Sequence, residues 1–416
     1  MTVGIVGLGY VGLPLAIEFA QAGTDVIGVD VDGERIAALS AGRSHVEDVP
    51  DERLAQSASR LSFTADYQRL GQADAVLICV PTPLTTHREP ELGALLAAAG
   101  ALAPVLAAGQ LVVLESTTFP GTTRETLVPI LEREGLRAGE DFAVAFSPER
   151  VDPGRRDHTI RNTPKVVGGL TAACTKRARE LYLSICDEVQ AVSTPEVAEL
   201  SKLLENIFRS VNIALVNELA MLAHRMDIDV WEVIDAAATK PFGFMRFDPG
   251  PGMGGHCLPV DPFYLSWKAR EYDFVPEFIE LAGKINQGQP YFCALRAAEA
   301  LSDAGKAVRG ADVLLLGVAY KGGVADIRES PALKLIDLLR ERGARVSYFD
   351  PHVPELAEHG LSCEPDAAAA AARADLVIVV TAHPGVDHPA LLDAAALVLD
   401  LRGITRGPPD GRVQRL

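Results

Sequence analysis

Short apolar runs alternate with longer amphipathic stretches through the first third of the chain. Most of these runs are rich in valine, leucine and isoleucine, as expected of a buried β-strand, and the stretches between the runs have a helical pattern. This alternation is typical of an α/β fold with a parallel, doubly wound sheet. The predicted strands are Val3–Val6, Val26–Val29, Ala75–Val80, Leu111–Leu114 and Ala143–Phe146.

The last quarter of the chain repeats this pattern. A helix is predicted over Pro331–Arg342, and the predicted strands are Val313–Leu316, Arg345–Phe349, Leu376–Val380 and Leu397–Leu401. Two Rossmann-like domains are therefore expected, one in each terminal part of the chain.

A long helix is predicted between them, from Thr194-Pro195-Glu196 to about Arg225. Threonine is a preferred N-cap, and proline and an acid suit the first turn. Apolar residues cover more than one face of this helix, so we expect it to be buried between domains or to form the spine of a homodimer. These residues are Leu200, Leu203, Leu204, Ile207, Phe208, Val211, Leu215, Val216 and Leu219.

Composition limits the classes of protein that fit the pattern. The 416 residues exceed one typical core, and we expect domains at residues 1–193, 194–300 and 301–416, with the central one helical. A net charge of -17 argues against nucleic acid or a membrane surface as the partner. The six cysteines form no metal-ligand pattern, so no metal is expected. With no leader or membrane-length apolar run, the expected location is the cytoplasm.

The loop after the first strand reads Gly7-Leu8-Gly9-Tyr10-Val11-Gly12, and the second strand ends at Asp30. In this fingerprint Gly7 permits the turn, Gly9 lets the backbone approach a pyrophosphate and Gly12 allows close helix packing. Asp30 would accept from ribose hydroxyls and repel a 2′-phosphate, which favours NAD⁺, although nearby Arg35 leaves NADP⁺ open. A glycine-rich turn without a ligand is the alternative.

Glycine and proline dominate the segment Gly250–Pro262, which also holds Cys257 and Asp261. Such a composition predicts neither helix nor strand, but a loop whose backbone can approach a ligand. The alternative for a cysteine is a buried apolar filler. The flanking glycines offer that alternative little apolar packing.

Further candidate site residues lie on the long helix and at the ends of predicted strands. Lys202 and Asn206 share one face of the long helix, where they could lower a thiol's pKa and stabilise an oxyanion, or simply be solvated. Ser116-Thr117 and Phe146–Arg150 lie at the carboxyl ends of predicted strands, at the edge where ligands bind in parallel sheets. An N-cap or a surface charge is the alternative for each.

At this point the chain resembles the UDP-glucose/GDP-mannose dehydrogenase family over essentially its whole length. The resemblance is carried, in order, by GLGYVGLPLA from Gly7, CVPTPL from Cys79, ESTTFPGTT from Glu115, FSPERVDPG from Phe146, AELSKLLEN from Ala198, GPGMGGHCLPVDP from Gly250 and GVAYKGGVADIRESP from Gly317.

The resemblance implies two successive oxidations of a UDP-sugar by NAD⁺, with Cys257 as the nucleophile. The other catalytic positions implied are Lys202 and Asn206 beside the anionic intermediates, Thr117 and Asp261 at a catalytic water, and Glu149 in thioester hydrolysis.

Binding positions follow from the same motifs. Cofactor contacts are expected at Gly7, Gly9, Tyr10, Val11, Gly12, Asp30, Arg35, Pro81, Thr82, Ser116 and Thr117. Substrate contacts are expected at Glu149, Arg150, Lys202, Asn206, Gly254, Gly255, His256, Tyr264, Lys321, Arg328 and Arg402, the last three as cations for the UDP part.

Two departures bear on the sugar. His256 precedes the cysteine and Val260 precedes Asp261, where relatives acting on plain hexoses commonly have a serine or tyrosine and a lysine. This form resembles the branch acting on UDP-N-acetylhexosamines, and UDP-GlcNAc is the expected substrate, with UDP-ManNAc and UDP-glucose as alternatives.

Two rival classes fit less well. A hydroxyacid dehydrogenase of the 6-phosphogluconate type needs no nucleophilic cysteine and has no second Rossmann-like domain. A non-catalytic dinucleotide-binding protein could lose Cys257, Lys202, Asn206 and Asp261, all of which are present.

Overall fold

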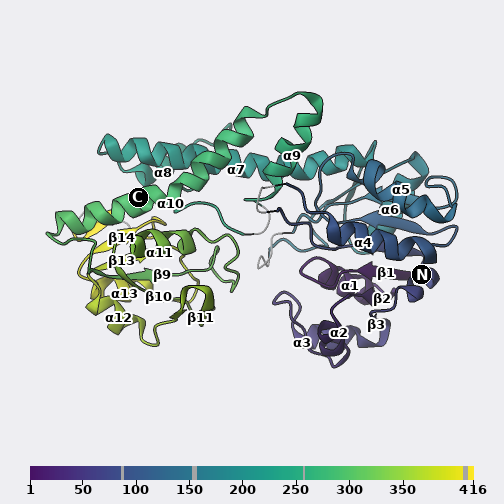
Figure 1. The fold of residues 1–416 in the computed structure, drawn as a ribbon, viewed down its shortest axis with the longest axis horizontal. Coiled ribbons are helices and arrows are strands. Elements are labelled where there is room, and N and C mark those ends of the chain that lie inside the picture. The colour runs from purple at the N-terminus through teal and green to yellow at the C-terminus, as the bar shows by residue number, and fades with distance from the viewer. Residues whose placement is uncertain (86–88, 152–156, 256–257, 406–410) are drawn as a thin grey trace. The chain divides into compact units, whose positions relative to one another are not determined.

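A computed structural model describes residues 1–85, 89–151, 157–255, 258–405 and 411–416 (Figure 1). Its contacts divide the chain into two compact units. The first unit comprises residues 1–205 and 267–274, and the second comprises residues 206–266 and 275–416. The expected three domains, with boundaries after residues 193 and 300, remain a prediction. No described helix is long and apolar enough to cross a membrane.

One sheet forms the centre of the first unit. Its strands are β1 (Thr2–Val6), β2 (Asp25–Val29), β3 (Leu61–Thr64), β4 (Ala75–Ile78), β5 (Leu111–Leu114), β6 (Ala143–Phe146), β7 (Lys165–Gly169) and β8 (Val189–Val192). Their order is β3-β2-β1-β4-β5-β6-β7-β8, which begins with the order of a dinucleotide-binding Rossmann sheet. β7 pairs antiparallel with β6 and parallel with β8. The last two strands therefore run opposite to the parallel strands before them.

Helices cover both faces of this sheet (Figure 1). Alternate residues of a strand point to opposite faces. Val3 and Ile5 therefore join the core formed with α1 and α6, whereas Val6 joins the core formed with α4 and α5. The helices are α1 (Gly12–Gln21), α2 (Gly33–Ser40), α3 (Asp51–Ser57), α4 (Gly93–Leu102), α5 (Val128–Leu131) and α6 (Ala172–Tyr182).

The long predicted helix is present as α7 (Pro195–Arg225). The Thr194 hydroxyl accepts from the Val197 N–H at 3.4 Å, as expected of an N-cap. Leu203 is fully buried, whereas Leu204 is 63% exposed in the single chain. Leu204 belongs to an exposed apolar stripe, which consists of Val197, Leu200, Leu204, Phe208, Leu215, Leu219 and Leu222.

The second unit has a smaller sheet. Its parallel strands are β9 (Asp312–Leu316), β10 (Arg345–Phe349), β13 (Leu376–Val379), β14 (Val398–Asp400) and β15 (Val413–Arg415), in the order β10-β9-β13-β14-β15. This is the other common order of doubly wound sheets. A separate short hairpin joins β11 (Glu355–Leu356) and β12 (Leu361–Ser362).

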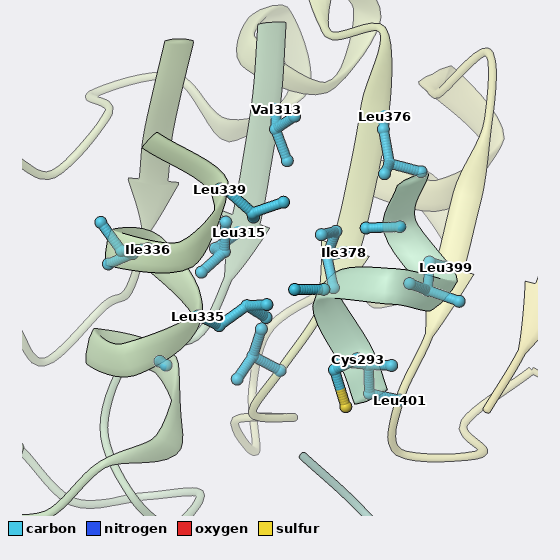
Figure 2. Packing of buried hydrophobic residues seen from close by; sticks show 14 of the residues in the cluster. Cys293, Val313, Leu315, Leu335, Ile336, Leu339, Leu376, Ile378, Leu399 and Leu401 are labelled. Carbon is cyan, nitrogen blue, oxygen red and sulfur yellow. The ribbon is translucent and has the colours of Figure 1, made fainter. Parts of the chain in front are cut away.

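Its helices are α8 (Val230–Ala238), α9 (Asp261–Ala269), α10 (Glu277–Asp303), α11 (Pro331–Glu341), α12 (Ala367–Arg373) and α13 (His388–Ala394), of which α9 crosses the boundary between the units. Figure 2 shows Leu335 and Leu339 of α11 and Cys293 packed together with Leu315 and Ile378 of the sheet, all fully buried. The opposite face packs against α12 and α13. The two sheets expected from the sequence are thus confirmed, each with its own core.

Candidate active site

The glycine loop between β1 and α1 has room for a ligand at one position only. Gly7 has φ +90°, and a Cβ added there would lie 2.7 Å from the carbonyl oxygen of Cys79. A Cβ on Gly12 would lie 1.9 Å from the carbonyl oxygen of Gly7, whereas one on Gly9 meets no atom within 4 Å. No described side chain caps the start of α1 at Val11, so the positive end of this helix faces the loop without a side-chain acceptor. The loop fits a pyrophosphate.

This difference predicts separable effects of two substitutions. Gly9→Ala should fold with an unchanged melting temperature but lose NAD⁺ affinity by at least about tenfold, roughly 1.4 kcal/mol, because its methyl group occupies space that only the ligand needs. Gly12→Ala should lower the melting temperature itself, because its Cβ collides with the protein backbone. Calorimetric titration and thermal unfolding measure the two effects. Normal NAD⁺ binding by Gly9→Ala would contradict this assignment.

Asp30 follows β2 and is 4% exposed. Its carboxylate accepts from the N–H groups of Leu8 (2.8 Å) and Asp32 (3.0 Å) and from Nη1 of Arg35 (2.9 Å). Burial alone would raise the pKa of Asp30, but these hydrogen bonds lower it below its usual value. Arg35 also lies 3.6 Å from Asp32, so two carboxylates balance its charge. This arrangement favours NAD⁺ over a cofactor with a 2′-phosphate.

Hydroxyl groups join the carboxyl ends of β4 and β5. Ser116 Oγ donates to the carbonyl of Val80 at 2.7 Å, and Thr82 Oγ1 donates to the carbonyl of Thr117 at 2.7 Å. Beside them Pro81 is exposed and Thr117 is half-buried, and Tyr10 of the glycine loop is 50% exposed. The structure therefore places the expected cofactor residues of these two strands at one edge of the sheet.

Glu149, just beyond β6, is held from several sides. Its Oε1 accepts from the N–H groups of Arg150 (2.7 Å) and Val151 (2.6 Å), and its carbonyl accepts from Lys202 Nζ at 2.6 Å. The Arg150 guanidinium lies 2.7 Å from the Glu205 carboxylate. Glu149, Arg150 and Lys202 are thus neighbours, as a common role would require.

Sequence reasoning missed Lys165 and Glu115, which form a buried ion pair of 2.8 Å beside Glu149. It also missed Glu199, whose carboxylate accepts from the Gly121 N–H (2.7 Å) and from the N–H and hydroxyl of Thr123 (2.8 and 2.7 Å). Burial raises the pKa of Glu199 to about 7. Glu199 fixes α7, one turn before Lys202, to the segment that follows Thr117. Its spacing of three from Lys202 was the available signal.

His256 and Cys257 lie outside the described residues, but the glycines before them are firmly packed within the second unit. The Gly255 N–H donates to the Arg328 carbonyl at 2.9 Å, and a Cβ on Gly254 or Gly255 would lie 2.7 or 2.8 Å from Tyr320. At the other end of the loop, a Cβ on Gly250 would lie 2.7 Å from the Arg402 guanidinium. The described glycines of this loop thus adjoin residues expected to bind UDP.

Buried amides fix the same loop to the helices. The Gly250 N–H donates to Asn217 Oδ1 at 2.9 Å, and Asn217 Nδ2 donates to Asn286 Oδ1 at 3.0 Å. After the loop, Asn206 Nδ2 donates to the buried carboxylate of Asp261. Two expected catalytic residues are therefore in direct contact.

One expectation for this segment was wrong. Residues 250–262 were expected to be loop throughout, but α9 begins at Asp261. Pro262 does not prevent this, because a helix leaves its first N–H groups unpaired and so accepts proline in its first turn.

Three further residues expected to contact the substrate are also described. Tyr264 of α9 is fully buried, Lys321 is half-buried, and the Arg328 guanidinium lies 2.6 Å from the Asp326 carboxylate.

The loop after β9 repeats the geometry of the loop after β1. The N–H of Gly317 donates to the carbonyl of Phe349 at 2.8 Å, and the N–H of Val318 donates to Asp350 at 2.7 Å, like the N–H groups of Gly7 and Leu8 in the first unit. Here, however, buried His383 lies 2.9 Å from the Asp350 carboxylate. Despite burial, the His383 ring and backbone N–H groups lower the pKa of Asp350 to about 2. The His383 ring therefore occupies the side of the Asp350 carboxylate that a ribose would need.

Among the residues described, no cluster of three or more acidic, His or Cys side chains could hold a metal ion.

Comparison with known protein families separates a dinucleotide-binding part of the chain from a UDP-binding part. Residues 1–186 match the NAD binding domain of the UDP-glucose/GDP-mannose dehydrogenase family, residues 196–288 its central domain and residues 314–407 its UDP binding domain.

Similar proteins cover almost the whole chain. A UDP-N-acetyl-D-glucosamine 6-dehydrogenase of Pseudomonas aeruginosa is 39% identical over 386 residues, which are 92% of this chain and 90% of the relative. A UDP-N-acetyl-D-mannosamine dehydrogenase of Pyrococcus horikoshii is 38% identical over 424 residues, 100% of this chain and 98% of the relative. The solved structure of a UDP-D-ManNAc dehydrogenase from Pyrococcus horikoshii has a TM-score of 0.91 at 36% identity and covers 100% of this chain and 99% of that one. The chain therefore belongs to the UDP-glucose/GDP-mannose dehydrogenase family and is an NAD-dependent nucleotide-sugar dehydrogenase.

Proposed function

We propose that the chain oxidises the 6-hydroxyl of a UDP-N-acetylhexosamine, UDP-GlcNAc in the first place, to the 6-carboxylate. The observation that carries the proposal is the packing of the cysteine loop. Gly254 and Gly255 lie against Tyr320 and the Arg328 carbonyl, in the domain matched to UDP binding. From this packing we infer that the loop serves a UDP-bound sugar, on which the Cys257 thiol acts.

The residue types proposed as catalytic suit a four-electron oxidation. NAD⁺, held at the Gly7–Gly12 loop, would supply the hydride acceptor for each of two oxidations of the sugar carbon. Between them the Cys257 thiolate adds to the aldehyde, and the second hydride leaves from the resulting thiohemiacetal. Lys202 and Asn206 supply the cation and the amide for the anionic intermediates. Water then adds to the thioester, Glu149 takes its proton, with Thr117 and Asp261 holding the water, and the C–S bond breaks to give carboxylate and thiol.

The sugar class is inferred from the loop and from the relatives. Val260 gives the loop an apolar side chain where a lysine would supply a hydrogen-bond donor, and this suits an acetamido methyl group better than a hydroxyl. The relatives named for UDP-N-acetyl-D-glucosamine and UDP-N-acetyl-D-mannosamine are 39% and 38% identical. UDP-ManNAc, which differs at C2, is therefore the second candidate.

A panel of UDP-sugars tests this proposal. Each UDP-GlcNAc consumed should yield two NADH, and kcat/KM for UDP-GlcNAc should exceed that for UDP-glucose by about 10–200-fold, the range that a small apolar difference in a pocket supports. NADH absorbance and product analysis measure both quantities. One NADH per sugar with free aldehyde would refute the two-step oxidation. A preference for UDP-glucose over the gluco, manno and galacto acetamido sugars would refute the substrate class alone.

We propose further that the chain forms a homodimer through the segment 194–300. The apolar stripe of α7 supports this, because Leu204, Leu215 and Leu222 are at least 50% exposed in the single chain. The cytoplasm stays the proposed location. The five described cysteines are free thiols, the state that a reducing compartment maintains.

A further inference from the structure

Four charged side chains meet at the carboxyl edge of the first unit's sheet, and two of them have no part in the proposed chemistry. Glu149 and Lys202 belong to the proposed site, whereas Glu115 and Lys165 do not. Glu115 and Lys165 are nevertheless 0% and 4% exposed, and charges are rarely buried so completely without strong partners.

The topology explains how Lys165 reaches this edge. Glu115 follows β5 and Glu149 follows β6, so both lie beyond the carboxyl ends of parallel neighbours. β7 pairs antiparallel with β6, through Phe146 and Gly168, and therefore begins where β6 ends. Its first residue, Lys165, is thus delivered to the same edge.

Lys165 links the two carboxylates. Its Nζ lies 2.8 Å from Glu115 Oε2 and 3.4 Å from Glu149 Oε2. The other oxygen of Glu115 accepts from the Tyr182 hydroxyl. Glu115 and Tyr182 therefore hold the lysine in position, and its contact with Glu149 is the longer of the two. The other oxygen of Glu149, Oε1, accepts from two backbone N–H groups.

The charges around Glu149 favour its anion. Lys165 from β7 and Lys202 from α7 attract it and Glu115 from β5 repels it, while the Arg150 guanidinium pairs with Glu205. Burial raises the pKa of Glu149, but Lys165, the Val151 N–H and Lys202 lower it below its usual value. Burial would likewise lower the pKa of Lys165, but Glu115 and Glu149 raise it.

We propose that Lys165, anchored by Glu115, is a positioning residue that holds the Glu149 carboxylate in place as an anion, ready to take a proton from the attacking water. This inference rests on the proposed function, because it assigns thioester hydrolysis to Glu149. Lys165 itself touches neither the sugar nor the cofactor in this role.

The test compares Lys165→Met with Lys165→Arg. In single turnovers with UDP-GlcNAc, the hydrolysis rate is the rate at which acid appears after the second NADH. As the pH rises, this rate should increase when Glu149 becomes an anion, and we call that part of the pH–rate profile the acid limb. In Lys165→Met the acid limb should move to higher pH by about one unit, because the opposite charge beside Glu149 is lost. At a pH below the limb, hydrolysis should then be about tenfold slower. Lys165→Arg keeps the charge and should keep the limb.

Lys268→Met is the matched control. Lys268 lies in the same unit, is 6% exposed and pairs with two carboxylates, those of Glu125 (2.8 Å) and Glu271 (2.7 Å). Its loss should lower stability as the loss of Lys165 does, without moving the acid limb. Glu115→Gln should move the limb the opposite way, downward, because it removes the repulsion and leaves Lys165 to Glu149 alone.

An acid limb that stays in place in Lys165→Met, or that moves equally in Lys268→Met, overturns the inference. If Lys165→Met does not fold, Glu115→Gln decides: a downward shift supports the role of Lys165, and an unchanged or upward shift contradicts it. Failure of the proposed function looks different, since the unaltered enzyme would then not yield two NADH and the acid from any UDP-N-acetylhexosamine.

Discussion

Replacing Cys257 by alanine should reduce formation of the sugar acid by at least about four orders of magnitude, the scale expected when a covalent nucleophile is removed. The physical reason lies in the second oxidation. An aldehyde carbon gives up a hydride only after a nucleophile has made it tetrahedral, and the thiolate is the nucleophile proposed for this chain. NAD⁺ binding should persist, because the Gly7–Gly12 loop folds with its own core in the first unit. Acid formation and NAD⁺ affinity are the measurements.

Cys293→Ala provides the control. Cys293 is fully buried in the core of the second unit (Figure 2), so removing its sulfur should lower stability slightly and leave acid formation intact. Near-normal acid formation by Cys257→Ala would show that the aldehyde is oxidised as its hydrate and that the thiol is structural.

Replacing Glu149 by glutamine should stop the enzyme after both hydrides have left. The amide oxygen can still accept from the Arg150 and Val151 N–H groups, so the local backbone should hold. The neutral amide cannot take a proton from water, however, and hydrolysis should slow by about 10²–10⁴-fold. A burst of two NADH per site should precede slow turnover, and the intact mass of the quenched protein should show an acyl adduct.

Glu205→Gln is the matched variant. It also neutralises a carboxylate near this edge, the one 2.7 Å from the Arg150 guanidinium, but it should accumulate no adduct. Release of acid from Glu149→Gln at the rate of the unaltered enzyme would exclude Glu149 from hydrolysis, and Lys165 would then have no catalytic group to position.

The local sequence pattern was enough to locate several strands, the start of the long helix and the dinucleotide loop. Runs of β-branched and leucine residues located β1, β2, β4, β5 and β6, because a strand buried on both faces must be apolar throughout. Thr194-Pro195 located the start of α7, and the glycine spacing located the dinucleotide loop, since these residues act through their own backbone geometry.

Other elements depended on distant contacts. The helix α10 contains Gly283, Gly288 and Pro290, each unfavourable in a helix interior; the segment 194–300 was expected to be helical, but the bounds of this helix were not predicted. Burial of Cys293, Ala294 and Ala297 in the core of the second unit offsets that cost. Helix α9 likewise begins within a segment whose composition reads as loop.

The site shows the same division. The chemistry of Cys257, Lys202, Asn206 and Asp261 was suggested by residue type and motif, and the structure adds the direct contact of Asn206 with Asp261. Lys165 was unpredictable, because nothing in its neighbouring residues reveals that β7 runs antiparallel to β6. That direction alone brings a lysine fifty residues from Glu115 in sequence to within 2.8 Å of it. A residue's type and spacing follow from sequence, but which buried charge faces which is decided only when the sheet is assembled.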